Sequence, residues 1–342
     1  MTKRQAVLDA LNHKENTTIP FQIDLTHQAL ENLVNYTGDP NIADTFEGYL
    51  MSVYYPGDFT ELPDRPGYFR DDFGVVWNRN GADKDIGVID SFMIPDLENN
   101  TYEFPKLDEE HLRRQYQQLM DSPRDAFKFG AIGFSMFERA WSLMGMENTL
   151  MAMIAYPEEL ERLLDQICEY NLKIIDIALE YDIDGFYFGD DWGQQHGLIM
   201  GPAHWRHFIK PRMARMYRKV KDAGKYVLQH SCGDCHEIFP DLIEIGLDCY
   251  QTFQPEVYDI ALMKEKYGNK LTFWGGISTQ RCLPYADEQG VIDEIKRVTS
   301  ILRKDGGLII APTHSVPFDV PPQNILAMAD VFLHQDKYFN EK

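Results

Sequence analysis

The chain has 342 residues, with 33 Lys and Arg against 54 Asp and Glu, so its formal net charge at pH 7 is −21. This acidic balance repels phosphate backbones, which excludes non-specific nucleic-acid binding and disfavours a polyanionic ligand outside a local basic pocket. Hydrophobic residues make up 44% and charged residues 25%, the composition of a globular protein and not of a disordered chain. No run of about 18 apolar residues is present, so we expect no transmembrane helix.

The N-terminal segment and the cysteine count indicate a cytoplasmic protein. Val7, Leu8 and Leu11 share one face of a helix behind a Thr2 cap, a pattern that predicts an amphipathic helix and not a signal peptide. Five cysteines in a long chain argue against a disulfide framework, because pairing would leave one over. We therefore expect a reducing cytoplasm and no membrane partner.

Short β-rich runs alternate with amphipathic helices through the second half of the chain. The strands expected there are 185–188, 226–228, 249–253, 271–274 and 308–310. Earlier strands are expected at 19–24 and 131–135, and one more within 54–76. Strands that alternate with helices predict a parallel sheet, and a total of about eight predicts a (β/α)8 TIM barrel. The alternative is a doubly wound open sheet, which is less favoured because no Gly-rich phosphate loop follows any strand.

We expect residues 1–342 to form a single α/β domain of this barrel type, with an N-terminal helical extension. The stretch 54–101 is rich in Pro, Gly and Asp, which predicts an irregular excursion with a short strand at 74–77. In a barrel, chemistry lies where the strands run out into the following loops. The polar side chains at such positions are Asp24, Glu138, Arg139, Asp190, Asp191, Gln194, Gln195, His230, Cys232, Gln254, Glu256, Ser278, Gln280, Thr313 and His314.

The segment from His230 to His236 reads His-Ser-Cys-Gly-Asp-Cys-His. His230 and Cys232 leave the end of a predicted strand, and side chains two apart point to the same side of an extended backbone. Imidazole nitrogen and thiolate sulfur are zinc ligands, and such a site needs one or two more. His314, at the end of the last strand, is the expected third ligand. The fallback ligands are Cys235, Cys249 and Glu256. The structural alternative is a buried cysteine beside a hydrogen-bonded histidine.

The same segment matches two other cysteine patterns. Cys232, Cys235 and His236 have the C-x-x-C-H spacing of c-type haem attachment, which is disfavoured because attachment implies export. A thiol redox motif would need a cysteine pair at the start of a helix in a small βαβ domain. Metal binding therefore remains the favoured function of this segment.

Two adjacent carboxylates, Asp190 and Asp191, follow another predicted strand. At a barrel mouth they repel each other, so we expect the pKa of one to rise, which suits a proton donor or a cation-binding group. The alternative is a solvated turn in which Asp190 caps the chain and Gly193 turns it. Trp192 beside them favours a pocket.

Two other acidic positions have alternative interpretations. Asp24 ends the first predicted strand, where it either contacts substrate or water or caps the helix that starts near Thr26. Glu138 and Arg139 are expected to pair with each other or to face solvent.

Several segments together resemble the uroporphyrinogen decarboxylase-like superfamily, which includes cobalamin-dependent methyltransferases. They are 18–21 leading into Asp24, 71–77, 188–194, 230–233, 273–277, 310–314 and 321–324. The combination of these segments is specific to this superfamily, although no single segment is. The resemblance covers nearly the whole chain and implies a TIM barrel.

Two branches of this superfamily differ at positions that the sequence shows. The decarboxylases are metal-free, bind an octacarboxylate tetrapyrrole and carry arginines after the first strand, whereas residues 24–30 here contain none. The methyltransferases carry a His-x-Cys motif and a later Cys that bind zinc. His230 and Cys232 match the motif, but His314 stands in place of the later Cys. The resemblance therefore implies the methyltransferase branch, with an altered set of zinc ligands.

On this resemblance we expect a zinc-dependent methyltransferase that moves a methyl group between a corrinoid (cobalamin) protein and a small thiol, methoxy or hydroxyl compound. Cobalamin would arrive on a separate protein, and a homodimer is compatible with the resemblance. Asp190 and Asp191 would orient substrate or supply a proton. The residues expected to bind substrate are Asp24, Glu138, Trp192, Gln194 and Gln254. The alternatives are a decarboxylase, in which Asp190 or Asp191 would stabilise pyrrole protonation, and a non-catalytic barrel that binds a corrinoid or substrate.

Overall fold

Seven parallel strands form the central sheet of the computed structural model, which describes residues 1–15, 17–55, 59–81 and 87–339. Each strand pairs in parallel with the next, and chain order is kept along the sheet. Consecutive parallel strands need crossover connections, which is why helices separate them. The strands are β1 (Leu50–Tyr55), β6 (Phe127–Ile132), β7 (Gly185–Gly189), β10 (Tyr226–His230), β11 (Cys249–Phe253), β12 (Thr272–Ile277) and β13 (Leu308–Pro312).

The extended segment around Phe21 closes this sheet into a barrel. Phe21 forms a parallel bridge with Ile310 of β13, and the N–H of Gln22 donates to the Ile310 carbonyl at 3.2 Å. On the other side, the N–H of Tyr49 donates to the Phe21 carbonyl at 3.0 Å, directly before β1 begins. The segment takes the place of an eighth strand, which confirms the predicted TIM-barrel fold.

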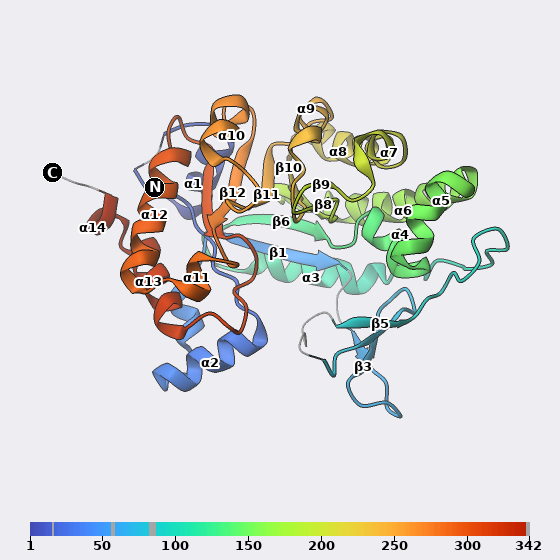
Figure 1. Ribbon diagram of the computed structural model, residues 1–342, viewed down its shortest axis with the longest axis horizontal. Helices are drawn as coiled ribbons and strands as arrows, with labels where there is room; N and C mark the ends of the chain where they lie inside the picture. The colour runs from blue at the N-terminus through green and yellow to red at the C-terminus, as the bar shows by residue number, and fades with distance from the viewer. Residues whose placement is uncertain (16, 56–58, 82–86, 340–342) are drawn as a thin grey trace.

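Helices surround the sheet (Figure 1), and the covering helices bury apolar stripes in the core. On α6, for example, Leu160, Leu163 and Leu164 are almost fully buried, as their helical spacing predicts. The helices between or after the barrel strands include α3 (Glu109–Asp121), α6 (Pro157–Ala178), α8 (Lys210–Asp222), α10 (Ile260–Tyr267), α12 (Glu288–Leu302) and α13 (Pro322–Leu333). The others are α2 (His27–Thr37), η1 (Ile42–Phe46), α4 (Phe137–Met144), α5 (Met146–Ala155), α7 (Gly201–His204), η2 (Trp205–Ile209), η3 (His236–Ile238), α9 (Phe239–Glu244), α11 (Cys282–Tyr285) and α14 (Gln335–Phe339).

The N-terminal helix α1 (Lys3–Leu11) covers the amino end of the barrel. Its cap is Thr2, as predicted, because the Thr2 hydroxyl accepts from the N–H of Gln5 at 3.1 Å. Val7 and Leu11 pack in one cluster with side chains from the first residues of several barrel strands. This packing closes the amino end and leaves the carboxyl end as the place for a pocket.

Two predicted strands are displaced from their expected positions. The strand expected within 54–76 is β1, at Leu50–Tyr55, and β6 runs over Phe127–Ile132 where 131–135 was expected. Residues 56–58 of the first stretch lie outside the described residues. On β1, Ser52 and Tyr54 face the cavity described below, so the strand lacks the apolar inner face by which the others are recognised. The short strand expected at 74–77 is β4.

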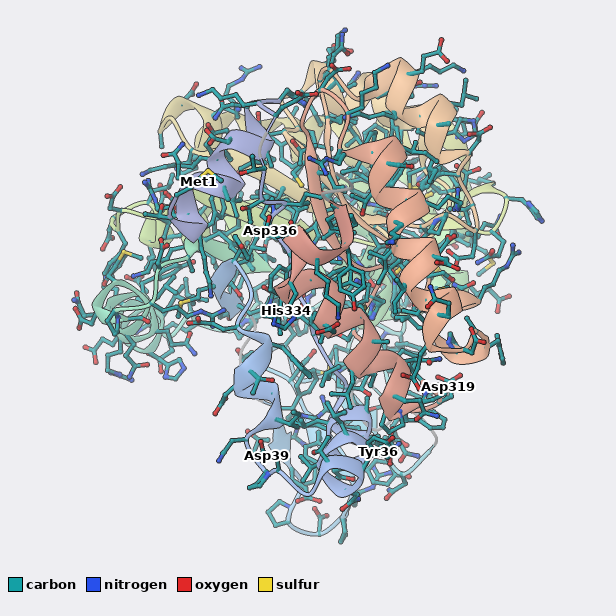
Figure 2. The ribbon with its side chains drawn as sticks, turned by 90° about the vertical axis from the view of Figure 1, so that its left-hand side faces the viewer. Met1, Tyr36, Asp39, Asp319, His334 and Asp336 are labelled. Atoms are coloured by element: carbon teal, nitrogen blue, oxygen red, sulfur yellow. The ribbon has the colours of Figure 1, made fainter. Side chains whose placement is uncertain are left out.

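The excursion forms a small antiparallel sheet outside the barrel. Its strands are β2 (Thr60–Glu61), β3 (Tyr68–Arg70), β4 (Val76–Asn78) and β5 (Val88–Ser91). In Figure 1, β1 and β6 point their carboxyl ends toward the side where this sheet, α4 and α5 lie. Figure 2 views the opposite side, which carries Met1 and Asp336, so both ends of the described chain lie away from the barrel mouth. None of the described helices has the length and apolar character to cross a membrane.

Candidate metal centre and its cavity

A cavity of about 430 Å³ opens at the carboxyl end of the barrel strands. Five residues expected from the sequence to bind substrate or metal line it: Asp24, Glu138, Asp191, His230 and His314. Other lining side chains come from the inner faces of the strands, and they include Ser52, Tyr54, Phe129, Tyr187, Gln251 and Trp274. The strand ends therefore bring the predicted residues to one mouth, as the barrel fold requires.

His230, Cys232 and His314 converge at the edge of this cavity, where His230 and His314 are lining residues and Cys232 lies beside them. One donor atom from each lies within 4.8 Å of the other two. Nε2 of His230 lies 3.6 Å from Sγ of Cys232, and the rings of His230 and His314 are 5.8 Å apart. Zinc bonds of about 2.3 Å to sulfur and about 2.0 Å to nitrogen, at a tetrahedral angle, place two such ligands about 3.5 Å apart. The donor set and its spacing thus fit a zinc ion.

Gln251 and Tyr187 orient the ring of His230. The Gln251 side-chain oxygen accepts from Nδ1 of His230, and it also accepts from the Tyr187 hydroxyl at 3.1 Å. With Nδ1 donating to Gln251, Nε2 is directed toward Cys232 and Asp191, and a metal ion bound there would replace the proton on Nε2, as in a metal-ligating histidine. Gln251 is a functional residue that sequence reasoning missed. Its signal was an amide side chain in the middle of a buried strand.

Asp191 lies against the same two ligands. Its Oδ1 accepts from the backbone N–H of Cys232 at 2.7 Å and lies 3.2 Å from Nε2 of His230. Burial alone would raise the pKa of Asp191, but the hydrogen bond and charge of His230 hold that pKa at about 2. Asp191 is therefore an anion at neutral pH and holds the Cys232 loop in place.

Two glycines let the loops after β7 and β10 touch backbone to backbone. A Cβ atom on Gly193 would lie 2.6 Å from the Cys232 carbonyl oxygen, and Gly233 has a φ of +75°. The N–H of Asp234 donates to the carbonyl of Gln194 at 2.8 Å across this contact. Only glycine permits so close an approach, so both positions shape the loop that carries Cys232.

Asp190 points away from the cavity and caps α4. Its carboxylate accepts from the N–H groups of Met136, Phe137 and Glu138 at 3.2, 2.9 and 2.8 Å, and from the indole N–H of Trp192 at 2.5 Å. No residue next to α4 supplies a side-chain cap, so this distant carboxylate satisfies the free N–H groups of the helix. Burial raises the pKa of Asp190 to about 6, while the four donors favour its anion.

Glu138 faces the cavity from the first turn of α4. Burial, together with the charges of Asp191 and Asp190, raises the pKa of Glu138 well above its ordinary value. Of the two adjacent aspartates, Asp190 has the raised pKa, but burial and not repulsion by Asp191 is its cause. Asp24 lines the same cavity and accepts from the side-chain amide of Gln22 at 2.9 Å.

Two predicted local pairings are wrong. Arg139 neither pairs with Glu138 nor faces solvent: it is buried, 3.2 Å from Asp71, with its guanidinium 3.7 Å from the centre of the Phe73 ring. Asp71 is 68 residues earlier in the chain, so no local pattern indicates this pair. Asp24 does not cap α2, because the Thr26 hydroxyl accepts from the helix N–H of Ala29.

Residues 122–333 match the family described as uroporphyrinogen decarboxylase (URO-D). The chain belongs to the URO-D family. A solved structure described as a methyltransferase from Methanosarcina mazei is 18% identical, with a TM-score of 0.72, and the match covers 99% of this chain and 100% of that one. This likeness shows a shared fold. A D-psicose 3-epimerase structure with D-fructose is 11% identical over 68% of this chain and 84% of its own, with a TM-score of 0.39. No curated protein matches.

Three predicted substrate-binding residues of this URO-D family protein are not among the lining residues of the cavity. Trp192 is fully buried beside Asp190, and Gln254 is buried with its side-chain oxygen on the N–H of Gly233 at 2.7 Å. Gln194 is exposed in β8 (Gly193–Gln194), which pairs with β9 (Gly197–Leu198). All three support the loops around Cys232 in this structure, and substrate contact by them stays a prediction.

The fallback metal ligands lie outside the cluster. The Cys235 thiol is buried against the Ser231 hydroxyl at 3.3 Å, and Cys249 is buried in the inner core at the amino end of β11. Glu256 contacts Ser278 on the loops after β11 and β12. All five cysteines are free thiols, and His236 is engaged with the Asp234 carboxylate at 2.6 Å.

Proposed function

We propose that this URO-D family protein is a zinc-dependent methyltransferase that exchanges a methyl group between a corrinoid protein and a small thiol, hydroxyl or methoxy compound. The observation that carries the proposal is the convergence of His230, Cys232 and His314 at the edge of the barrel cavity, which His230 and His314 line. The description of the Methanosarcina mazei neighbour as a methyltransferase agrees with it.

His230, Cys232 and His314 would hold zinc with a position left open toward the cavity. Zinc bound there supplies Lewis acidity that lowers the pKa of a thiol or hydroxyl and favours its anion. The corrinoid, carried by a separate protein, supplies or accepts the methyl group. The chain itself holds the zinc-binding side chains in place before a metal ion binds. Gln251 directs the His230 ring, and Asp191 holds the Cys232 backbone.

The remaining cavity residues would bind and orient the small substrate. Phe129 and Trp274 supply an apolar floor that excludes water from the reacting heteroatom. Burial and the neighbouring carboxylates raise the pKa of Glu138, which favours exchange of a proton between this carboxylate and the substrate at the cavity surface. Asp190 acts indirectly in this scheme, since it fixes the first turn of α4 and so the place of Glu138.

The cavity disfavours decarboxylation of an octacarboxylate tetrapyrrole. Such a ligand needs cationic partners, whereas the cavity presents the carboxylates of Asp24, Glu138 and Asp191. Within the described residues, no Lys or Arg lines it.

Methyl transfer from methylcobalamin to a panel of small thiols, followed by the change in the corrinoid spectrum, tests the proposal. We expect turnover by the wild-type protein and a loss of about 100-fold or more in Cys232→Ala. Cys282→Ala is the matched control, because Cys282 is a free thiol outside the cluster. A wild-type protein inactive with every thiol and, in the reverse direction, with every methoxy compound would contradict methyl transfer and favour a binding role.

A further inference from the structure

Three carboxylates reach the cavity beside the metal-ligand cluster, and Asp191 is the only one of them with a charged partner among the described residues, His230. Asp24, Glu138 and Asp191 reach it from three different elements: the segment that closes the barrel, the helix α4 and the loop after β7. No lysine or arginine is among its lining residues in the part of the chain that the structure describes. Arg139, next to Glu138, is turned away and neutralised by Asp71. An anionic substrate would meet repulsion on several sides.

Aromatic rings form the floor of the same cavity. The Tyr187 ring lies 6.0 Å from that of Phe129 and 5.9 Å from that of Trp274, and the Phe129 and Trp274 rings are 6.3 Å apart at 90°. Tyr187 also lies 6.1 Å from the ring of His230, so this floor adjoins the metal ligands. The faces of such rings attract organic cations, most strongly where water is excluded.

Two of the carboxylates are available to a ligand. The Asp24 carboxylate accepts a hydrogen bond from the neutral amide of Gln22, and Glu138 forms no salt bridge with any described residue. Burial and like charges raise the pKa of Glu138, and an entering cation would offset this rise. Asp191, by contrast, is committed to His230 and to the Cys232 backbone.

We propose that the small substrate carries an organic ammonium group, which Asp24, Glu138 and the aromatic floor bind while its thiol, hydroxyl or methoxy group faces the metal ligands. The substrate class is therefore an amino thiol, an amino alcohol or its methyl ether, and not a carboxylated or sulfonated thiol. This inference rests on the proposed function for the identity of the reacting heteroatom. The ammonium site itself depends only on the cavity.

Binding of choline to the full-length, chelator-treated protein tests the ammonium site without zinc or corrinoid. Its neutral isostere, 3,3-dimethylbutan-1-ol, has the same shape without the charge. Calorimetry should show choline binding about 10-fold more tightly than the isostere. In Glu138→Gln and Trp274→Leu the choline affinity should fall about 5- to 10-fold, with the isostere affinity within about twofold of wild type. The isostere also reports whether a variant keeps its cavity. Asp182→Asn, at an exposed partner of Lys225, should bind both as wild type does.

Equal affinities for choline and the isostere, or tighter binding of the neutral compound, would overturn the inference. The methyl-transfer assay with 2-aminoethanethiol, 2-mercaptoethanol and mercaptoacetate separates this outcome from failure of the proposed function. Rates that fall in that order support both proposals. Selective choline binding with no thiol methylated supports the ammonium site and contradicts methyl transfer. Preferred methylation of mercaptoacetate overturns the inference and leaves the proposed function standing.

Discussion

The side-chain oxygen of Gln251 accepts a hydrogen bond from Nδ1 of His230 and thereby aims Nε2 at Cys232. In Gln251→Met this acceptor is lost, while the side chain keeps a similar length. We expect the apparent zinc affinity to fall about 10- to 100-fold, because an outer partner fixes the tautomer and ring direction of a ligating histidine. Competition with a chromophoric chelator measures it.

Gln280→Met is the control for this change. Gln280 is exposed, and its loop lies outside the ligand cluster. Its zinc affinity should equal that of the wild type. An unchanged affinity in Gln251→Met would show that the hydrogen bond does not set the ligand geometry.

Gly233→Ala should be much more harmful than Gly224→Ala. Both glycines have nearly the same φ, +75° and +71°, so both variants carry a similar backbone cost of about 1 kcal/mol. At Gly224 nothing lies within 4 Å of the added Cβ, whereas at Gly233 it would meet the backbone of Gly193 and Gln194. For Gly233→Ala we expect a further loss of about 2 kcal/mol in the free energy of unfolding, together with weaker zinc binding. Urea denaturation compares the pair, and similar losses would contradict the tight backbone contact.

Asp190→Asn should destabilise the protein by about 3 kcal/mol, because the amide group would face buried N–H donors that now share a carboxylate. Denaturant unfolding measures the change. In Asp182→Asn, which removes an exposed carboxylate, the change should be within about 0.5 kcal/mol. A small effect at Asp190 with lost methyl transfer would instead favour direct catalysis by this residue.

The strand ends were the most predictable part of this molecule. Each carries its own local signal, so the His230, Cys232 and His314 set could be proposed from two short motifs and the barrel topology. Contacts between distant segments had no such signal. The backbone donors to Asp190 come from residues 52 to 54 positions earlier, so its capping role depends on how α4 packs against β7. Gln251 was missed because a strand's inner face is expected to be apolar, and here it borders a polar cavity.

Stability should fall below neutral pH partly through His13. Burial, together with the charge of Lys264, lowers the pKa of this imidazole in the folded chain below its ordinary value of 6.5. The unfolded chain therefore binds the extra proton first, and stability decreases as the pH falls through about 6.5. Unfolding free energies measured between pH 7.5 and pH 5 should decrease less in His13→Asn than in the wild type. Parallel curves would contradict a neutral, buried His13.

X-ray absorption at the zinc edge, combined with metal analysis of the purified protein, tests the metal centre most directly. The proposed metal centre predicts one zinc ion per chain, with one sulfur neighbour at about 2.3 Å and imidazole nitrogens at about 2.0 Å. The sulfur signal should vanish in Cys232→Ala and persist in Cys235→Ala. A wild-type protein that binds no zinc, or zinc without a sulfur neighbour, would contradict the assignment of His230, Cys232 and His314 as its ligands.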